Sequence, residues 1–430
     1  MNEGERSSEL AYFPSVAAEQ EQTFNRARFM KTHIVSGAMS VLLCSILSVQ
    51  CGGQKAAEST QLKGDQVNVV GQNPYSGNDF FVNPYFVENL QKSKEKNPEL
   101  SDKISQMQKQ GGTGIWVVNR ELVGVVDRFL TAAREQRAQS GRNVTTTFVV
   151  YNLPERDCSA NASAGELYLD QDGLNKYKSE FIDRIAEAFR RYPEMAISVV
   201  LEPDSLPNIV TNNGVRRCND RVFQAYREGV AYAIQKLALP NVAIYLDAGH
   251  AGWLGWDNNR AGVARVFREV IDLAGGAHLI RGFATNVSNY TPLREPDPSD
   301  ERRKSAYYGY NPAMDELTYV DLLQKNFQQA GLNGMKFIID TGRNGNPRAR
   351  TVWGNWCNVR EATLGAAPQV NPEPNIDAYV WIKPPGESDG SAVYETPTQG
   401  KDSSCASADS MAVSPVAGEW FHEHLVQLLR

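Results

Sequence analysis

The chain has 430 residues, of which 41% are hydrophobic, and it carries a formal net charge of −6 at pH 7. This length and apolar content suffice for one large core, of the size that a single α/β barrel needs. The chain has no excess of basic residues, which excludes the electrostatic signature of a nucleic-acid-binding protein.

The first 72 residues differ in composition from the rest. Residues 1–33 form a polar leader, and residues 34–51 are an apolar stretch that is typical of a signal-peptide core or an anchor. This stretch is short for a membrane span, so we expect a secreted, extracellular protein without stable membrane association. Residues 52–72 have the composition of a flexible linker, which leaves residues 73–430 as the main domain, and we expect a monomer.

Seven apolar runs are typical of buried strands, and they cover residues 114–118, 147–151, 196–200, 242–246, 279–284, 336–339 and 379–382. Segments with helical periodicity lie between several of them, at residues 177–192, 222–237, 261–273 and 319–330. Alternating strands and helices indicate βαβ units and a mainly parallel sheet. We therefore predict an α/β fold, a distorted and incomplete TIM-like barrel with seven parallel strands.

Acidic side chains follow five of these runs, namely Asp157, Asp204, Asp247, Asp340 and the pair Glu387 and Asp389. An Asp in such a position is often only the N-cap of the next helix. Five of them on one rim are harder to explain as caps, because the loops after barrel strands carry the chemistry of these folds. The pattern therefore indicates an active site built from carboxylates.

Six motifs resemble glycoside hydrolase family 6, and they occur in the order of that family: YNLPERDC (151–158), LEPDSL (201–206), YLDAGHAGWLGW (245–256), ATNVSNY (284–290), WGNWCN (353–358) and WIKPPGESDG (381–390). The resemblance implies an inverting hydrolase of β-1,4-glucosidic bonds. Its substrates would be cellulose and cello-oligosaccharides, and it would need no cofactor and no metal.

The resemblance also assigns catalytic roles. Asp204 matches the general acid, and Asp157 matches the carboxylate that influences its protonation. Asp389 matches the candidate base, acting directly or through a chain of water. Ser163 would hold the nucleophilic water, and Tyr151 would crowd the distorted sugar. Acetal hydrolysis by inversion needs a protonated carboxyl at the leaving oxygen and a carboxylate or water relay on the opposite face, so these residue types suit the reaction.

Sugar-binding residues follow from the same resemblance. The indole platforms would be Trp116, Trp253, Trp256 and Trp356, and the contacts to hydroxyl groups would be His250, Asn286, Lys383 and Glu387. Flat aromatic faces suit glucose rings, although core packing is the alternative for each tryptophan. Asp247 resembles a structural member of the acid network.

The chain has six cysteines and no C-x-x-C spacing. Disulfides in an oxidising compartment are therefore a better interpretation than zinc ligands. The family resemblance pairs Cys158 with Cys218 and Cys357 with Cys405.

Three questions stay open at this stage. A carbohydrate-binding protein without catalysis would need the loss of an acid, yet Asp157, Asp204 and Asp389 are all present. A metal-dependent hydrolase would use Asp247 with His250, or His422 with His424, and we expect the last two on the surface of a terminal helix. The insertion at residues 390–404 favours exo action from non-reducing ends with cellobiose as the product, and endo action is the alternative.

Overall fold

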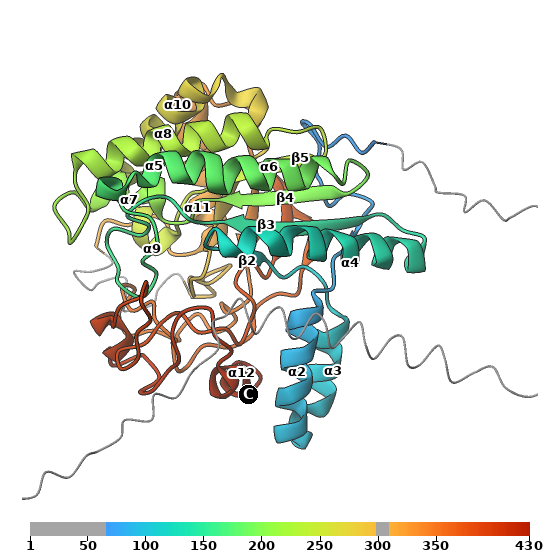
Figure 1. The fold of residues 1–430 in the computed structure, drawn as a ribbon. Helices are drawn as coiled ribbons and strands as arrows, with labels where there is room; N and C mark the ends of the chain where they lie inside the picture. Colours follow the sequence, from blue (N-terminus) through green and yellow to red (C-terminus); the bar gives the residue numbers. More distant parts are fainter. Residues whose placement is uncertain (1–65, 298–308) are drawn as a thin grey trace, which may run out of the picture. The chain divides into compact units, whose positions relative to one another are not determined.

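The computed structural model describes residues 66–297 and 309–430, which form one mostly parallel sheet surrounded by helices (Figure 1). The predicted polar leader and apolar stretch, and most of the predicted linker, lie outside the described residues. Within the described ranges, no helix combines the length and the apolar character that crossing a membrane requires.

The sheet has the strand order β1-β3-β4-β5-β6-β7-β9-β8, with β2 paired to β3. All of these pairs are parallel except the antiparallel pair of β8 and β9. The strands are β1 (Asp79–Phe80), β2 (Ile115–Val117), β3 (Val144–Val150), β4 (Ala196–Leu201), β5 (Val242–Asp247), β6 (Gly282–Thr285), β7 (Lys336–Asp340), β8 (Gln369–Glu373) and β9 (Ile376–Val380). Each of the seven predicted runs contributes a strand, whereas β1 and β8 were not predicted.

The sheet curls until the chain before β2 meets the chain after β9. Thr113 and Trp381 form an isolated parallel bridge there. The amide of Gly114 donates to the carbonyl of Trp381 at 3.0 Å, and the amide of Trp381 donates to the carbonyl of Gly112 at 2.9 Å. Because no full ladder joins these segments, the barrel is incomplete, and the predicted fold class is confirmed.

Helices lie around the sheet and beside its loops. They are α2 (Pro84–Lys96), α3 (Ser101–Lys109), α4 (Val125–Ser140), α5 (Gly173–Lys176), α6 (Asp183–Arg190), α7 (Ser205–Thr211), α8 (Asp220–Leu237), α9 (Ala251–Leu254), α10 (Asp257–Ala274), α11 (Glu316–Gln329) and α12 (His422–Leu428). One π-helical segment, Tyr177–Ile182, joins α5 to α6, so the helix predicted at 177–192 is a composite. Short 3₁₀ turns occur at Pro98–Leu100, Glu121–Gly124, Leu169–Gln171, Ala277–Leu279 and Ser403–Ala406.

The sequence explains where several helices begin. The Asn219 side chain accepts a hydrogen bond from the Val222 amide at the start of α8, and Asp315 caps α11 through the Thr318 amide. Both are N-caps of the kind that Asn and Asp favour. Helices α8 and α10 lie side by side in Figure 1, and the α2–α3 pair lies apart from them, near α12.

The core lies inside the curled sheet, where strands β3, β4 and β5 are buried along their whole length. Inward-facing members include Val149, Val200, Tyr245, Ile338 and Val380. Strands buried on both faces read as continuous apolar runs, which is why they were visible in the sequence. The predicted acids follow the carboxyl ends of these strands, so the fold gathers them at one edge.

Candidate active site

Asp204 lies between β4 and α7, in a backbone conformation with a φ of 65°. Its amide donates to Asp247 Oδ2 at 2.8 Å, and the Tyr151 hydroxyl donates to Asp204 Oδ2 at 3.0 Å. Desolvation, reinforced by the negative charges of Asp157 and Asp247, raises the pKa of Asp204 well above its usual value. This environment keeps the carboxyl protonated, as a general acid requires.

Asp157 follows β3 in the β3 loop, which we define as residues 151–168. It is 8% exposed, and Ser159 Oγ donates to its Oδ1 at 3.1 Å. The Ser163 hydroxyl donates to Asp157 Oδ2. Since that bond uses the only hydroxyl proton of Ser163, its lone pairs are left to accept a hydrogen bond from water.

Asp247 ends β5 and is buried behind Asp204. Burial raises the pKa of Asp247 to about 7, while the backbone amides of Asp204 and Gly249 oppose that effect. Its contact is to the backbone of Asp204, so the carboxylate fixes the turn that presents the acid.

Two charged residues that the sequence analysis did not single out organise the β3 loop. The Arg156 guanidinium lies 4.7 Å from the centre of the Tyr151 ring and donates to four backbone carbonyls, those of Val118, Tyr151, Ser163 and Ala164. Glu202 accepts from the amides of Asn152 and Leu153 at 3.1 and 3.2 Å, and burial raises its pKa to about 7. Arg156 lies in the RDC motif and Glu202 in the LEPDSL motif, and both motifs are otherwise mostly buried. A charged residue in such a motif was the signal that could have identified them.

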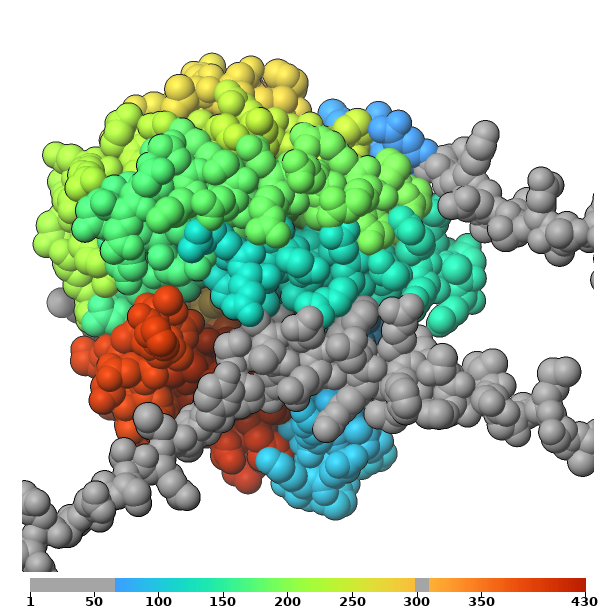
Figure 2. All heavy atoms as spheres, viewed as in Figure 1, coloured from blue at the N-terminus to red at the C-terminus, as the bar shows by residue number. Residues whose placement is uncertain are grey.

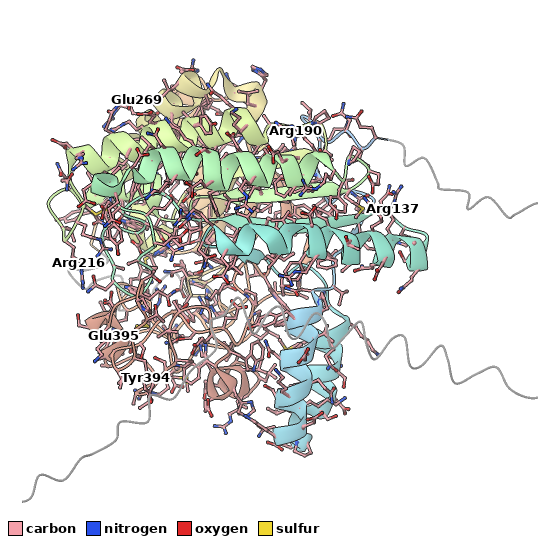
Figure 3. The ribbon with its side chains drawn as sticks, in the orientation of Figure 1. Arg137, Arg190, Arg216, Glu269, Tyr394 and Glu395 are labelled. Carbon is pink, nitrogen blue, oxygen red and sulfur yellow. A yellow bond between two sulfur atoms is a disulfide. The ribbon has the colours of Figure 1, made fainter. Side chains whose placement is uncertain are left out.

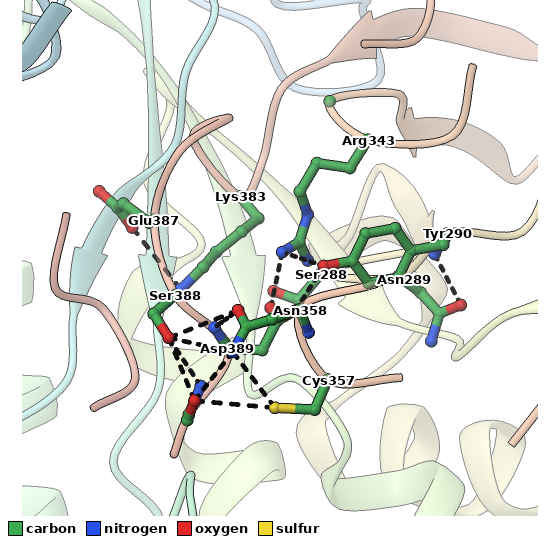
Figure 4. Close-up of polar contacts among 12 residues, drawn as sticks. Ser288, Asn289, Tyr290, Arg343, Cys357, Asn358, Lys383, Glu387, Ser388 and Asp389 are labelled. Carbon is green, nitrogen blue, oxygen red and sulfur yellow. Dashed lines mark hydrogen bonds and ion pairs between the residues drawn. The ribbon is translucent and has the colours of Figure 1, made fainter. Parts of the chain in front are cut away.

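Asp389 lies on the other side of the site, in the network drawn in Figure 4. Its Oδ1 accepts from Arg343 Nη1 at 2.7 Å, and its Oδ2 accepts from the Tyr290 hydroxyl at 2.6 Å and from the Asn358 amide at 2.9 Å. Burial alone would raise the pKa of Asp389, but the charges of Arg343 and Lys383 outweigh it, and the pKa falls below its usual value. This carboxylate therefore favours the ionised form and accepts hydrogen bonds from three protein donors.

The network around Asp389 comes from segments that are far apart in the sequence. Tyr290 and Asn358 close two of the recognised motifs, and Arg343 follows β7 outside any of them. Arg343 also donates to the Tyr290 hydroxyl at 2.8 Å, and its guanidinium lies 4.4 Å from that ring centre. The sequence analysis missed all three residues.

Gly390 brings the Asp389 segment against the β3 loop. It has a φ of 147°, and a Cβ at this position would lie 2.4 Å from the Cβ of Ala162. Only glycine fits such a conformation and such an approach. The two carboxylate clusters are therefore parts of one site, with Ala162 adjacent to Ser163.

Lys383, Glu387 and Trp116 lie close together. Lys383 Nζ is 3.6 Å from Glu387 Oε2 and 5.3 Å from the centre of the Trp116 ring. Burial raises the pKa of Glu387 to about 7 against the opposing charge of Lys383. The Trp116 ring in turn packs edge-on against Tyr151, at 5.9 Å between centroids. These three predicted binding residues thus reach the acid cluster through Tyr151.

Two more of the predicted tryptophans, Trp253 and Trp256, lie in or beside α9, as does His250. Trp253 Nε1 donates to Thr211 Oγ1 at 2.7 Å, and Trp256 Nε1 donates to the Gly309 carbonyl at 2.9 Å. Both rings are half-buried, as is Trp356. His250 Nε2 and Nδ1 lie 3.0 Å from Asn289 Nδ2 and 3.2 Å from Thr291 Oγ1, and burial keeps the pKa of this imidazole well below its usual value. The half-buried tryptophan rings are compatible with sugar stacking.

Asn286 requires a correction. It is fully buried, and its Nδ2 donates to the carbonyls of Thr291 and Asp340 at 3.2 and 2.9 Å. Its Oδ1 accepts from the Thr291 amide at 3.1 Å. With its amide protons used inside the protein, Asn286 braces the loop after β6 and does not offer a donor to a sugar hydroxyl.

His424 requires a second correction, because it is fully buried in α12 rather than exposed on a helix surface. Its ring lies 6.2 Å from that of Tyr290, and burial, with the charge of Arg343, lowers its pKa to about 4. Among the residues that the structure describes, no group of three or more His, Cys, Asp or Glu side chains is arranged to hold a metal ion.

Both predicted disulfides are confirmed. Cys158 is bonded to Cys218 and Cys357 to Cys405, each pair with 4.9 Å between α-carbons. The first bridge ties the β3 loop to the segment before α8. The second ties the segment that contains Asn358 to the end of the C-terminal loop, which we define as residues 390–405.

Comparison with known proteins identifies consistent relatives. The family model described as glycosyl hydrolases family 6 matches residues 75–430. The chain is 39% identical to 1,4-beta-D-glucan cellobiohydrolase CEL6C of Podospora anserina, over 85% of this chain and 87% of the relative. It is 37% identical to a putative endoglucanase type B of Fusarium oxysporum, over 83% of this chain and 76% of the relative. Among solved structures, the CcCel6A catalytic domain complexed with p-nitrophenyl β-D-cellotrioside matches with a TM-score of 0.77 and 40% identity, covering 83% of this chain and 97% of that chain.

Proposed function

The chain belongs to glycosyl hydrolases family 6 and acts on cellulose as a glycoside hydrolase, and from that premise we propose that it is a secreted, inverting enzyme of the exo type. It would attack β-1,4-glucan chains from their non-reducing ends and release mainly cellobiose. The observation that carries the proposal is the environment of Asp204, whose pKa is raised by desolvation and by two neighbouring acids.

In the proposed reaction, Asp204 gives its proton to the glycosidic oxygen as the bond to the anomeric carbon breaks. Tyr151, hydrogen-bonded to Asp204, lies where it would crowd the sugar ring. A water molecule attacks the anomeric carbon from the opposite face and inverts its configuration. The product sugar regains a hydroxyl group, and the proton lost by the water must leave through the protein.

Two routes are available for that proton. Asp389 is an acceptor of low proton affinity, because Arg343 and Lys383 stabilise its charge. Ser163 can accept a hydrogen bond from the water while it donates to Asp157. We propose that the serine route carries the proton and that Asp389 acts as a fixed negative charge.

The exo mode is supported by the two loops that flank the site. Each is tied by a disulfide, and they contact each other directly between Asn161 and Asp402. Joined loops would cover a bound polymer and require entry by a chain end. The endo alternative remains the second candidate, since one relative at 37% identity is named as a putative endoglucanase.

A single assay tests the mechanism and the mode together. The enzyme would be incubated with cellohexaose in an NMR tube, and the anomeric signals and product lengths would be followed from the first minutes. We expect α-cellobiose as the first product and little cellotriose. Early β-anomer would exclude inversion, and a rapid fall in the viscosity of carboxymethyl cellulose would favour the endo alternative.

A further inference from the structure

The β3 loop and the C-terminal loop meet at a small joint, formed by residues 161–162 and 400–402. Asp402 Oδ2 accepts from the Asn161 amide at 2.8 Å and from the Ala162 amide at 3.4 Å. The Gly400 amide donates to the Asn161 carbonyl at 3.0 Å. In the space-filling view, the C-terminal segment (red) lies directly against the green residues from the middle of the chain (Figure 2). Asp402 itself is 1% exposed, so the joint excludes water from this carboxylate.

Beside the joint, the two loops are separated by a cavity of about 240 Å³. Its walls include Arg156 and Tyr168 on one side and residues 396–400 on the other. Because the loops leave this space between them, their association here depends on the few polar contacts of the joint rather than on apolar packing.

Neighbouring cations hold both sides of the joint. Arg216 Nη2 lies 3.7 Å from Asp402 Oδ1. The next residue, Arg217, donates through Nη1 to Asn161 Oδ1 at 3.2 Å and through Nη2 to the Asp157 carbonyl at 3.1 Å. Burial would raise the pKa of Asp402, but the amides of Ser404 and Asn161 and the charge of Arg216 outweigh it and lower the pKa. Asp402 is thus a buried anion that connects three segments of chain.

The tip of the C-terminal loop lies away from the joint. Tyr394 and Glu395 lie at its exposed tip, on the same side of the described domain as Arg216 (Figure 3). Between this tip and the Cys405 bridge, the joint is the point where the loop is tied to the β3 loop. Loss of the joint would therefore detach residues 400–402 from the β3 loop.

We infer that Asp402 determines how often this enzyme cuts inside a chain, because it locks the C-terminal loop onto the β3 loop. With the lock closed, a polymer has to enter by an end. With the lock open, an internal segment of the polymer can enter from the side. Asp402 is a positioning residue here, acting through the loop, and the inference rests on the proposed function.

The test is the ratio of two activities, internal cuts in carboxymethyl cellulose and cellobiose release from phosphoric-acid-swollen cellulose. Asp402→Ala should raise this ratio about tenfold, since loss of a charge-assisted hydrogen bond commonly shifts an equilibrium by that factor or more. Asp402→Asn, which keeps an acceptor oxygen, should raise it less. The matched control is Glu395→Gln, which removes the same charge from the exposed tip of the same loop and should leave the ratio unchanged.

A second variant tests the lock without removing it. A Cβ at Gly400 would lie 3.3 Å from the Cβ of Asn161, close to the separation that a disulfide needs. The double variant Asn161→Cys with Gly400→Cys should therefore form a bridge across the joint. In the wild-type background it should lower internal cutting further, and in the Asp402→Ala background it should restore the low ratio.

The turnover of cellotetraose distinguishes loop opening from general damage, because a short substrate needs no covered cleft. We expect kcat on cellotetraose to change less than about twofold in Asp402→Ala, since ordinary effects outside the site are of that size. An unchanged ratio in Asp402→Ala would overturn the inference. If Asp402→Ala fails to fold, the inference is overturned when the bridge between positions 161 and 400 leaves the ratio of the wild-type enzyme unchanged. A wild-type enzyme that releases no cellobiose would instead count against the proposed function.

Discussion

Asp204 and Asp389 are the same kind of residue in the same site, yet their surroundings are opposite. Asp204 has Asp157 and Asp247 as neighbours, whereas Asp389 is paired with Arg343 and lies near Lys383. Burial favours the neutral form of both carboxyls. At Asp204 the neighbouring charges add to that effect, and at Asp389 they reverse it. These two buried acids therefore differ in charge because of their partners, since burial acts on both in the same direction.

This difference separates two tasks. The raised pKa of Asp204 favours a carboxyl that has a proton to give, and the lowered pKa of Asp389 favours a carboxylate with little affinity for one. The prediction from family resemblance that Asp389 is the base stays a prediction, and the electrostatic role is our proposal. Three experiments would break or sharpen the comparison.

The largest effect is expected for Asp204→Asn. Protonation of the leaving oxygen is worth roughly 10² to 10⁴ in rate, so kcat/KM on cellohexaose should fall by that factor. Activity on β-cellobiosyl fluoride should fall far less, because fluoride leaves without strong protonation. The exposed acid Asp170 offers a control as Asp170→Asn. Equal losses on both substrates would show that Asp204 is not the proton donor.

The second effect concerns stability. Asp389→Asn should lower the free energy of unfolding by about 3 to 5 kcal/mol, because it leaves the buried charge of Arg343 unpaired. Asp204→Asn should cost much less, since that carboxyl is already neutral. Chemical denaturation of both variants at pH 7 provides the measurement. Similar losses in the two variants would contradict the difference that we describe.

The smallest effect is expected for His424, which is packed beside Tyr290 behind Asp389. Its pKa is about 4 in the folded protein and 6.5 as an unperturbed group. The unfolded chain therefore binds a proton that the folded protein refuses, and stability is lost as the pH falls from 6.5 toward 4. Since each pH unit is worth about 1.4 kcal/mol, the loss approaches about 3 kcal/mol near pH 4.

His424→Phe keeps a ring of similar size and removes the titration. The free energy of unfolding should therefore fall less steeply between pH 6.5 and pH 4 in this variant than in the wild type, as measured in denaturant at several pH values. His278, which is exposed in the 3₁₀ turn Ala277–Leu279, is the control as His278→Phe. Identical pH profiles for His424→Phe and the wild type would show that the buried imidazole does not titrate as described.

Much of the scaffold could be predicted from the sequence, because strands buried on both faces are continuous apolar runs and five of the seven predicted runs end near an acid. Strand β8 was missed because its residues are partly exposed and include Pro372. The helices α2 and α3 were missed because their sequences are largely polar, with their buried side chains gathered on one side. In such helices few apolar residues mark the buried face, so the helical periodicity of the sequence is hard to recognise.

The site was predictable only as far as its motifs reached. Tyr151, Asp157 and Asp204 lie in two short motifs and Ser163 follows the first of them, and the structure brings the four together. The partners of Asp389 come from three separate loops, and their pairing depends on tertiary structure. His424 was misplaced because a polar residue on a short terminal helix gives no sign that the fold buries it.

The bridge between Cys357 and Cys405 makes a covalent ring that contains Asp389 and the exposed tip of the C-terminal loop. Tyr394 at that tip is 53% exposed and is open to proteolysis. A protease that cuts there would leave two fragments held by the bridge, with Asp389 on the first and Asp402 on the second. The nicked enzyme would migrate as one species until a reductant is added, so an intact band on a non-reducing gel would not prove an intact loop.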